Sequence, residues 1–237
     1  MVMLLAVGFH GVLAQEKTPS SDEKADRSLK GQVVDARTGD PLIGAFVRVE
    51  GDEWGSLSDK DGSFGLPDME PGLTPIMVEQ LGYVTLRQEV DVKENGEAVT
   101  LRVEPDPILK EGIEGLLDRL ETRRKGAATS SWVLNRADLL SNPSIDALSL
   151  LRARTPVRLV PCGVGGECAL VQGRVSPISV YVDEMPFLGG MDYLRSQQPY
   201  ELQRIEVFAG GRHIRIYTEG YLKRAGIASA MLSAFIL

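Results

Sequence analysis

Patterns of histidine and serine that support catalysis are sparse in this sequence. It contains two histidines, His10 and His213. A zinc site built on two imidazoles would need both of them in one folded unit, and His10 falls in an apolar N-terminal run. His213 lies in GGRHIRIYT, an alternating segment that predicts a strand with a surface histidine. GxSxG, HExxH and P-loop motifs do not occur, so none of these motifs supplies a catalytic residue.

Carboxylates are the next candidates for a catalytic or metal-binding role. Asp183, Glu184 and Glu206 could supply an acid–base pair, although acids at strand ends usually face solvent or cap loops. Asp59 and Asp61 suggest calcium, but the residues SFG that follow them lack the further oxygen ligands of an EF-hand loop. We therefore expect a hairpin turn there, and a protein without metal, cofactor or enzymatic activity.

The two cysteines, Cys162 and Cys168, lie in PCGVGGEC. In an oxidising compartment, two cysteines that close a short glycine-rich loop indicate a disulfide. A redox pair usually has two residues between its cysteines, whereas five lie between these, and a metal site would need more ligands. A disulfide is the expected state.

Charge and the N-terminus bear on the compartment and the partners. The formal net charge is −7, and the densest basic run, Arg123 to Lys125, ends a predicted helix, so no nucleic-acid partner is expected. Val2–Phe9 is apolar and Val12–Ala14 supplies small or aliphatic residues at cleavage positions, although no Lys or Arg precedes this run. Residues 1–14 are predicted to be a signal peptide and residues 15–28, charged and poor in apolar residues, a flexible linker.

Residues 29–104 show the alternation of short strands separated by turn residues. Turn chemistry occurs at TGDP and DKDG, and Glu94-Asn95-Gly96 predicts a tight hairpin. Seven short strands of this kind predict an antiparallel β-sandwich. The expected strands are Lys30–Asp35, Gly44–Glu50, Trp54–Ser58, Ser63–Leu66, Thr74–Gln80, Val84–Asp91 and Ala98–Glu104.

A set of fixed spacings runs through these residues, in LKGQVVDARTGDPLIGAFVRVEG, SDKDGSFGLPDMEPG and VEQLGYV. The positions that carry the pattern are Gly31, Val33, Asp35, Thr38, Gly39, Pro41, Leu42, Gly44, Ala45, Val47, Asp59, Asp61, Gly62, Phe64, Pro71, Gly72, Gly82 and Tyr83. In these features the segment resembles the carboxypeptidase regulatory-like domain, a transthyretin-like sandwich. The resemblance implies a non-catalytic envelope accessory of carbohydrate-binding-like fold, with Phe64 and Tyr83 as core or rim anchors.

Residues 105–135 are predicted to be a linker and an amphipathic helix. Apolar residues at Ile113, Leu116, Leu117 and Leu120 have helical spacing over Ile108–Lys125. Two prolines in EPDP mark the boundary with the sandwich. We expect this helix to pack on the second domain rather than on a partner protein.

The remaining residues predict a small α+β domain. Asn142-Pro143 predicts a cap for a helix over Ser144–Arg154, and a second, short helix is expected over Met191–Gln198. The expected strands are Val157–Val160, Ala169–Gln172, Ile178–Val182, Arg204–Phe208 and His213–Thr218.

Residues 136–219 carry a second set of spacings, at Val182, Asp183, Pro186, Ile205, Glu206, Val207, Gly210, Ile216 and Thr218. They resemble the plug domain of TonB-dependent outer-membrane receptors, although Glu184 replaces the usual glycine after Asp183. The barrel that such a plug fills, of about 22 strands, is missing, so this chain is not expected to transport a ligand by itself. Residues 220–237 are predicted to be an apolar tail whose Ile227–Leu237 segment is too short to span a bilayer.

Three functional hypotheses follow. The first is a non-enzymatic exported protein of the periplasm or outer membrane that recognises an envelope protein or a glycan, with possible outer-membrane association. The second is the sandwich-plus-plug remnant of a TonB-dependent receptor. The third is an uncharacterised enzyme that uses Asp183, Glu184 and Glu206.

Overall fold

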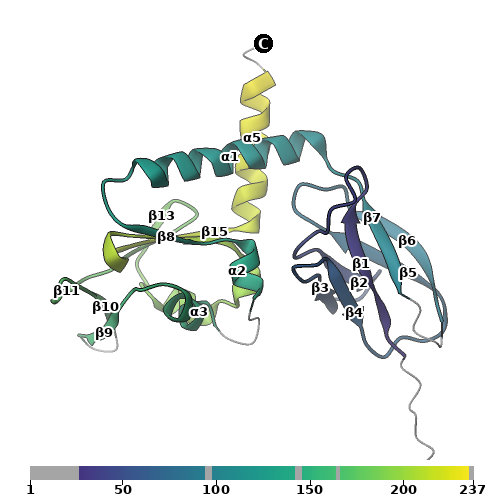
Figure 1. Cartoon of the computed structure of the whole chain (residues 1–237), viewed down its shortest axis with the longest axis horizontal. Helices are drawn as coiled ribbons and strands as arrows, with labels where there is room; N and C mark the ends of the chain where they lie inside the picture. Colours follow the sequence, from purple (N-terminus) through teal and green to yellow (C-terminus); the bar gives the residue numbers. More distant parts are fainter. Residues whose placement is uncertain (1–26, 94–97, 142–145, 164–165, 235–237) are drawn as a thin grey trace, which may run out of the picture.

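The computed structural model describes residues 27–93, 98–141, 146–163 and 166–234. The predicted signal peptide, the hairpin at Glu94-Asn95-Gly96 and the predicted Asn142-Pro143 cap lie outside these residues. Figure 1 shows a β-sandwich on one side and a second unit on the other, with a long helix, α1, running above both.

The N-terminal unit is a β-sandwich of two sheets. One sheet has the strand order β4-β1-β7, and the other has the order β3-β2-β5-β6. The expectation of a purely antiparallel sandwich was wrong at one place, because β1 and β7 pair in parallel. The strands are β1 (Leu29–Asp35), β2 (Phe46–Val49), β3 (Gly55–Leu57), β4 (Ser63–Leu66), β5 (Gly72–Glu79), β6 (Leu86–Val92) and β7 (Val99–Val103).

Alternating apolar residues from both sheets form the core of the sandwich. Val33, Val47, Val78 and Leu101 are fully buried, and Phe64 packs among them as expected from the sequence. Strands place alternate side chains on opposite faces, so this pattern of Val and Leu produces one dry layer between the sheets. All seven predicted strands are present, with ends that differ by a few residues.

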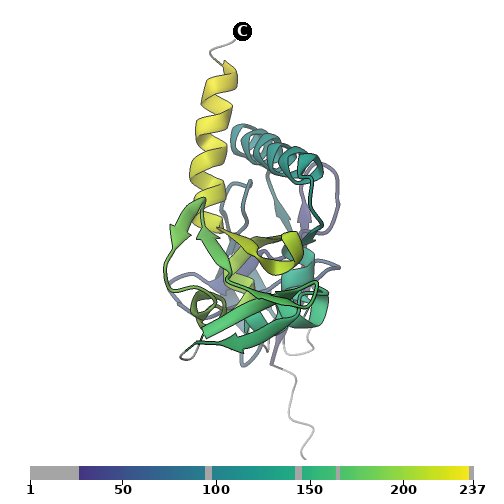
Figure 2. The ribbon, with the colours of Figure 1, turned by 90° about the vertical axis from the view of Figure 1, so that its left-hand side faces the viewer.

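Helix α1 (Pro107–Gly126) begins after Asp106, whose side chain accepts a hydrogen bond from the backbone N–H of Leu109. It crosses α5 (Glu219–Ala234), which stands nearly upright behind it in Figure 1 and beside it in Figure 2. A Cβ added at Gly112 would lie 2.1 Å from the carbonyl oxygen of Gly226, so glycine allows the two helices to touch. Residues 220–234, for which the sequence predicted only an apolar tail, belong to this helix.

The second unit is built on a mixed five-stranded sheet with the order β13-β12-β15-β14-β8. Helices α2, α3 and α4 contribute Leu139, Leu148 and Leu194 to the core on one face of this sheet. The elements are β8 (Ser131–Leu134), α2 (Arg136–Leu140), α3 (Ala147–Arg154), β12 (Ser179–Val182), β13 (Met185–Phe187), α4 (Asp192–Ser196), η1 (Pro199–Glu201), β14 (Leu202–Phe208), η2 (Ala209–Gly211) and β15 (His213–Thr218).

A separate three-stranded sheet, in the order β11-β10-β9, extends from this unit. It comprises β9 (Leu159–Cys162), β10 (Gly166–Val171) and β11 (Arg174–Ser176). The sequence missed β8, α2, β11, β13 and the helical state of α5, because each is short or lacks a clear period. Helix α3 is capped by Asp146. No described helix is long and apolar enough to cross a membrane.

Candidate functional site

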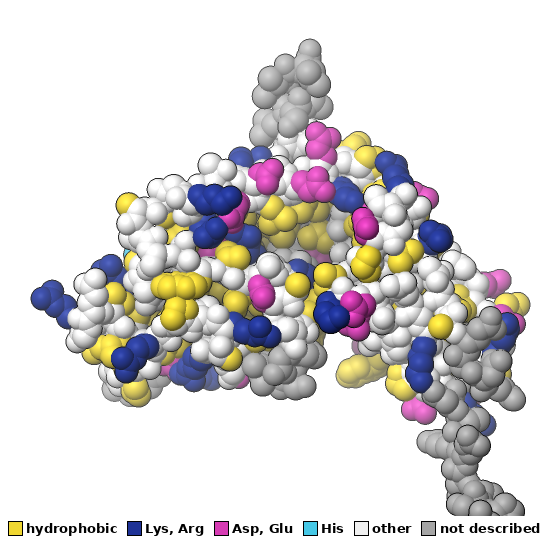
Figure 3. Space-filling model, viewed as in Figure 1, with side chains coloured by type: hydrophobic (Ala, Val, Ile, Leu, Met, Phe, Trp, Pro, Cys, Tyr) yellow, Lys and Arg dark blue, Asp and Glu magenta, His cyan; other side chains and the backbone are white. Residues whose placement is uncertain are grey.

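A cavity of about 650 Å³ lies between the sandwich and the second unit. We call it the interdomain groove. Figure 3 shows hydrophobic side chains gathered in a hollow beneath α1, with acidic and basic side chains around it. The groove is lined by Gly44, Phe46, Glu53, Trp54, Gly55, Leu57, Glu79, Gln80, Leu81, Arg136, Tyr200 and Glu219.

Trp54 is the most unusual side chain of the groove. It lies in the turn between β2 and β3, which is held by a 2.6 Å hydrogen bond from Arg48 Nη1 to the carbonyl oxygen of Asp52. Its side chain is 88% exposed, and that of Tyr200, across the groove on η1, is 41% exposed. Tryptophan is highly buried on average, so an exposed Trp54 beside Phe46 and Tyr200 in a concave surface is the strongest candidate for a ligand contact in this groove.

Arg136 forms part of the wall on the side of the second unit. Its Nη1 donates to the carbonyl oxygens of Tyr200 at 2.6 Å and Leu202 at 2.8 Å. Burial lowers the pKa of Arg136, and nearby Glu219 partly offsets that effect. The guanidinium is therefore committed to the backbone and orients η1, which carries Tyr200.

Gly44 lies where the two units touch. A Cβ on this residue would lie 2.8 Å from both Nε of Arg136 and Cδ1 of Leu140. Its φ of +76° is also in the left-handed region that favours glycine. This motif glycine thus allows α2 of the second unit to approach the sandwich.

The groove carries more carboxylates than cations. Glu53, Glu79 and Glu219 face a single guanidinium, that of Arg136. Glu79 lies 3.4 Å from the Arg48 guanidinium, and Glu219 accepts a 3.3 Å hydrogen bond from Gln203. Aromatic faces next to hydrogen-bond acceptors form a surface suited to a ligand with both C–H faces and hydroxyl groups.

Asp35, a motif residue of the sandwich, ties α1 to this unit. Its Oδ2 accepts from the Tyr83 hydroxyl at 2.8 Å and from Lys110 Nζ at 3.1 Å, while Oδ1 accepts from the backbone N–H groups of Arg37 and Thr38. Burial alone would raise the pKa of Asp35, but these hydrogen bonds hold it well below its usual range. Tyr83 is therefore an anchor at the rim, as expected.

An ion-pair network joins the C-terminal end of α1 to the face of the sheet opposite the core. Glu206 is fully buried and binds Arg123 at 2.9 Å and Arg204 at 2.8 Å. Glu184 accepts from Arg123 at 2.6 Å and pairs with Arg215. Burial raises the pKa of Glu184, but these partners and Tyr217 bring it below its usual value. Both carboxylates of the proposed acid–base pair thus have structural partners.

The other predicted acids hold turns. Asp183 accepts hydrogen bonds from the backbone N–H and hydroxyl of Thr218 at 2.9 and 2.8 Å. Asp59 accepts from the N–H groups of Asp61 and Ser63, which is the expected turn. Within the described residues no three His, Cys, Asp or Glu side chains are grouped to hold a metal ion.

The remaining motif residues support the fold. Gly31, Gly39, Pro41, Gly62, Pro71, Gly72 and Gly82 lie in the strands and turns of the sandwich. Gly210 lies in η2, Ile205 and Val207 are buried in β14, and Pro186 lies on β13. His213 is exposed on β15. None of these residues lines the interdomain groove.

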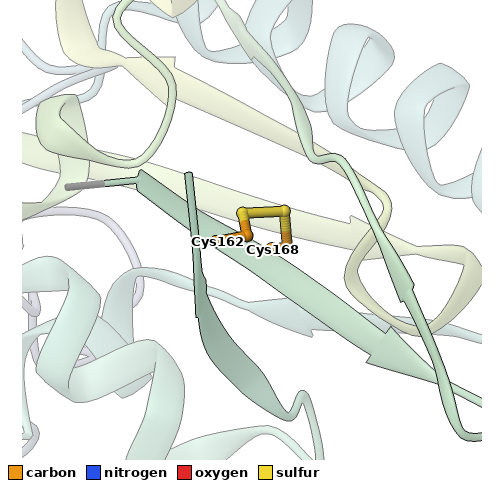
Figure 4. The surroundings of a disulfide bond; sticks show 2 residues. All are labelled: Cys162 and Cys168. Carbon is orange, nitrogen blue, oxygen red and sulfur yellow. A yellow bond between two sulfur atoms is a disulfide. The ribbon is translucent and has the colours of Figure 1, made fainter. Parts of the chain in front are cut away.

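Cys162 and Cys168 form a disulfide, as the sequence predicts, across the β9–β10 hairpin (Figure 4). The neighbouring Glu167 accepts from Arg152 of α3 and Arg195 of α4 at 2.5 and 2.8 Å. The hairpin is therefore fixed both covalently and by charge.

The residues that line the groove were missed by the sequence reasoning, apart from Gly44. Trp54 was placed only as the start of a strand, and Arg136 and Tyr200 had no motif. A tryptophan beside glycine and acids in a turn, DEWGS, was the one available signal. Its partners come from a distant part of the chain, so the groove is visible only in the folded structure.

Residues 29–113 match the CarboxypepD_reg-like domain. The match is the resemblance seen in the sequence, and it covers less than half of the chain. It continues past the sandwich to Ile113 in α1. Since Lys110 binds Asp35 and Tyr83, the start of α1 packs as part of the CarboxypepD_reg-like domain. The comparison gives no match to a receptor plug.

A search of curated proteins finds no match. Among solved structures, a type II cohesin–X-dockerin complex of Acetivibrio cellulolyticus with a mutated C-terminal interface shares 18% identity, covering 32% of this chain and 51% of that one, with a TM-score of 0.25. A protein of Bacteroides uniformis described as a "putative carbohydrate binding protein" shares 17% identity over 34% and 42% of the two chains, with a TM-score of 0.29. Likenesses of this size indicate no function.

Proposed function

We propose that this chain is an exported, non-enzymatic binding protein of the cell envelope that holds an oligosaccharide in the interdomain groove. The observation that carries the proposal is the exposed Trp54 in a groove that also contains Phe46 and Tyr200. A groove of about 650 Å³ has the size of a small-ligand site.

Sugars fit this chemistry. The C–H face of a pyranose ring packs on an aromatic face, and its hydroxyl groups donate to carboxylates and amides such as Glu53, Glu79 and Gln80. Glu79 is paired with Arg48, and the Arg136 guanidinium is committed to backbone carbonyls. Glu53 and Glu219 are thus the charges that would repel an acidic sugar. A neutral oligosaccharide is therefore the proposed ligand.

Export is proposed on two features. The apolar run near the N-terminus has the character of a signal peptide, and the Cys162–Cys168 disulfide is suited to an oxidising compartment. We propose no catalytic role for the second unit, because Glu184 and Glu206 are both held in ion pairs with arginines.

The test is a screen of neutral and acidic oligosaccharides against the whole chain, followed by calorimetry with the best ligand. Trp54→Ala should weaken its binding at least tenfold, about 1.4 kcal/mol, because the stacking face is lost. Leu73→Ala, which removes another exposed side chain of the sandwich outside the groove, is the matched control. Failure of every oligosaccharide to bind, or equal binding by Trp54→Ala, would refute the proposal, and cleavage of a bound oligosaccharide would show an enzyme.

A second candidate is the N-terminal part of a TonB-dependent receptor. It is motivated by the order β12, α4, β14 and β15, which follows the strand, helix and two strands of the plug resemblance, with the additional strand β13 between β12 and α4. Sequencing of the locus tests it. A downstream reading frame of alternating amphipathic strands would support it, whereas an unrelated gene would remove it.

A further inference from the structure

A second cavity, of about 340 Å³, lies on the sheet face opposite the core, at the C-terminal end of α1. We call it the cationic pocket. It is separate from the interdomain groove, with which it shares no lining residue. It is lined by Arg123, Ala127, Tyr181, Phe208, His213 and Arg215.

The strand register explains why these side chains gather. Tyr181 of β12 lies beside Arg215 of β15, and Phe208 of β14 lies opposite His213 of β15. His213 and Arg215 are two residues apart and therefore project from the same face. Arg123 reaches this face from α1, as its bond to Glu206 shows.

The described residues that line the cavity include two guanidinium groups, those of Arg123 and Arg215, and no carboxylate. Their ion-pair partners, Glu184 and Glu206, lie outside the lining. The concave surface therefore presents cationic groups to the cavity, where they would stabilise a bound anion.

Arg215 has donors to spare. A guanidinium carries five N–H donors, and among the described contacts Arg215 uses only Nη1, for Glu184. Its guanidinium carbon lies 5.0 Å from the centre of the Tyr181 ring, and stacking of this kind fixes the plane of the group. The remaining donors can therefore form a fork for a carboxylate.

We infer that the cationic pocket binds a small organic carboxylate that carries a planar ring. The carboxylate group would accept from Arg215 and Arg123, with His213 at the edge. The ring would pack against Tyr181 and Phe208, which favours such a ligand over a bare inorganic anion. A volume of about 340 Å³ accommodates a ligand of this size.

The test uses phenylacetate and benzoate as probes of the whole chain, in calorimetry and ligand-observed NMR at low salt. Benzyl alcohol, which has the ring without the charge, and inorganic phosphate, which has the charge without the ring, are the control ligands. The carboxylates should bind at least tenfold more tightly than either control, and more weakly as salt increases.

Arg215→Gln should weaken carboxylate binding at least tenfold. Arg212→Gln is the matched control, because Arg212 is an exposed arginine immediately before β15 that does not line the pocket, and it should change binding less than twofold. If loss of the Glu184 pair prevents Arg215→Gln from folding, Phe208→Leu and His213→Gln replace it and should weaken phenylacetate binding at least threefold.

Absence of carboxylate binding, equal binding of benzyl alcohol or phosphate, or equal effects of the two arginine substitutions would overturn the inference. These outcomes leave the oligosaccharide proposal untouched, because Trp54 and the groove are not involved.

Discussion

Single buried polar side chains decide how the parts of this protein join. Asp35 has a side chain that is only 3% exposed, yet four donors satisfy its two oxygens, one of them Lys110 from α1. A buried carboxylate is stable only with such partners. An acid suits this position of the motif, because the turn after β1, the Tyr83 side chain and α1 all donate hydrogen bonds to the Asp35 carboxylate.

The substitution Asp35→Asn tests this role. It keeps the shape but removes the charge and leaves donors facing an amide, so we expect the free energy of unfolding to fall by about 3 kcal/mol at pH 7. Urea unfolding measures the change. Asp40→Asn, in the exposed part of the same turn, should change it by less than about 0.5 kcal/mol.

The same substitution predicts a pH dependence. The folded pKa of Asp35 is lowered, so its contribution to stability is complete above the unfolded pKa of about 4 and is lost as the pH falls towards the folded pKa. The difference between the wild-type protein and Asp35→Asn should therefore narrow at pH 3 relative to pH 7. If the difference in the free energy of unfolding between the two proteins stayed constant from pH 7 to pH 3, the pKa of Asp35 would not be lowered in the folded state.

At the scale of elements, the sequence predicted those strands and helices whose formation depends on the alternation of apolar residues and on nearby turn residues. The seven strands of the sandwich, α1 and β15 follow from period and turn residues. The β8 strand and α5 did not follow, because β8 pairs with β14 more than seventy residues away and α5 owes its position to contact with α1. Glycine disfavours a helix, so the pattern of the sequence gives no reason for Gly112 within α1, whereas the structure shows it at the contact with α5.

Two glycines of α1 allow a matched test. Gly112→Ala places a Cβ 2.1 Å from the backbone oxygen of Gly226, whereas at Gly115 the nearest atom is 3.7 Å away. Alanine favours a helix over glycine by about 1 kcal/mol, so Gly115→Ala should stabilise the protein slightly. Gly112→Ala should destabilise it by about 1–3 kcal/mol, because the helices must separate.

Thermal and urea unfolding of the two variants decide the matter. A stabilised Gly112→Ala variant would show that α1 and α5 do not meet at this point.

At the scale of the whole molecule, α1 connects both units, through Lys110 at its start and Arg123 near its end. The sequence could separate the two units at the EPDP segment, but it could not predict their contact. That contact joins Gly44 to Arg136 and Leu140, and no periodicity relates residues so far apart in the chain. The candidate groove exists only because of this contact, so a motif search finds the sandwich and misses the groove.

The substitution Gly44→Leu tests whether the units act as one body. A leucine there would meet Arg136 and Leu140, and should push the second unit away from the sandwich. Gly39→Leu is the matched control, since its φ of +79° imposes similar backbone strain while no atom lies within 4 Å of its added Cβ. Both variants bear a strain of about 1–3 kcal/mol, so a difference between them reports the contact of the units.

We expect Gly44→Leu to unfold in two calorimetric transitions, to show a larger radius of gyration in small-angle scattering, and to lose oligosaccharide binding. Gly39→Leu should retain one transition, the wild-type radius and the ligand. The reason is cooperativity: units that share a buried contact unfold together, and units that lose it unfold according to their own stability. Identical behaviour of the two variants would show that the sandwich and the second unit are joined by α1 alone, and the groove between them would then lose its basis as a binding site.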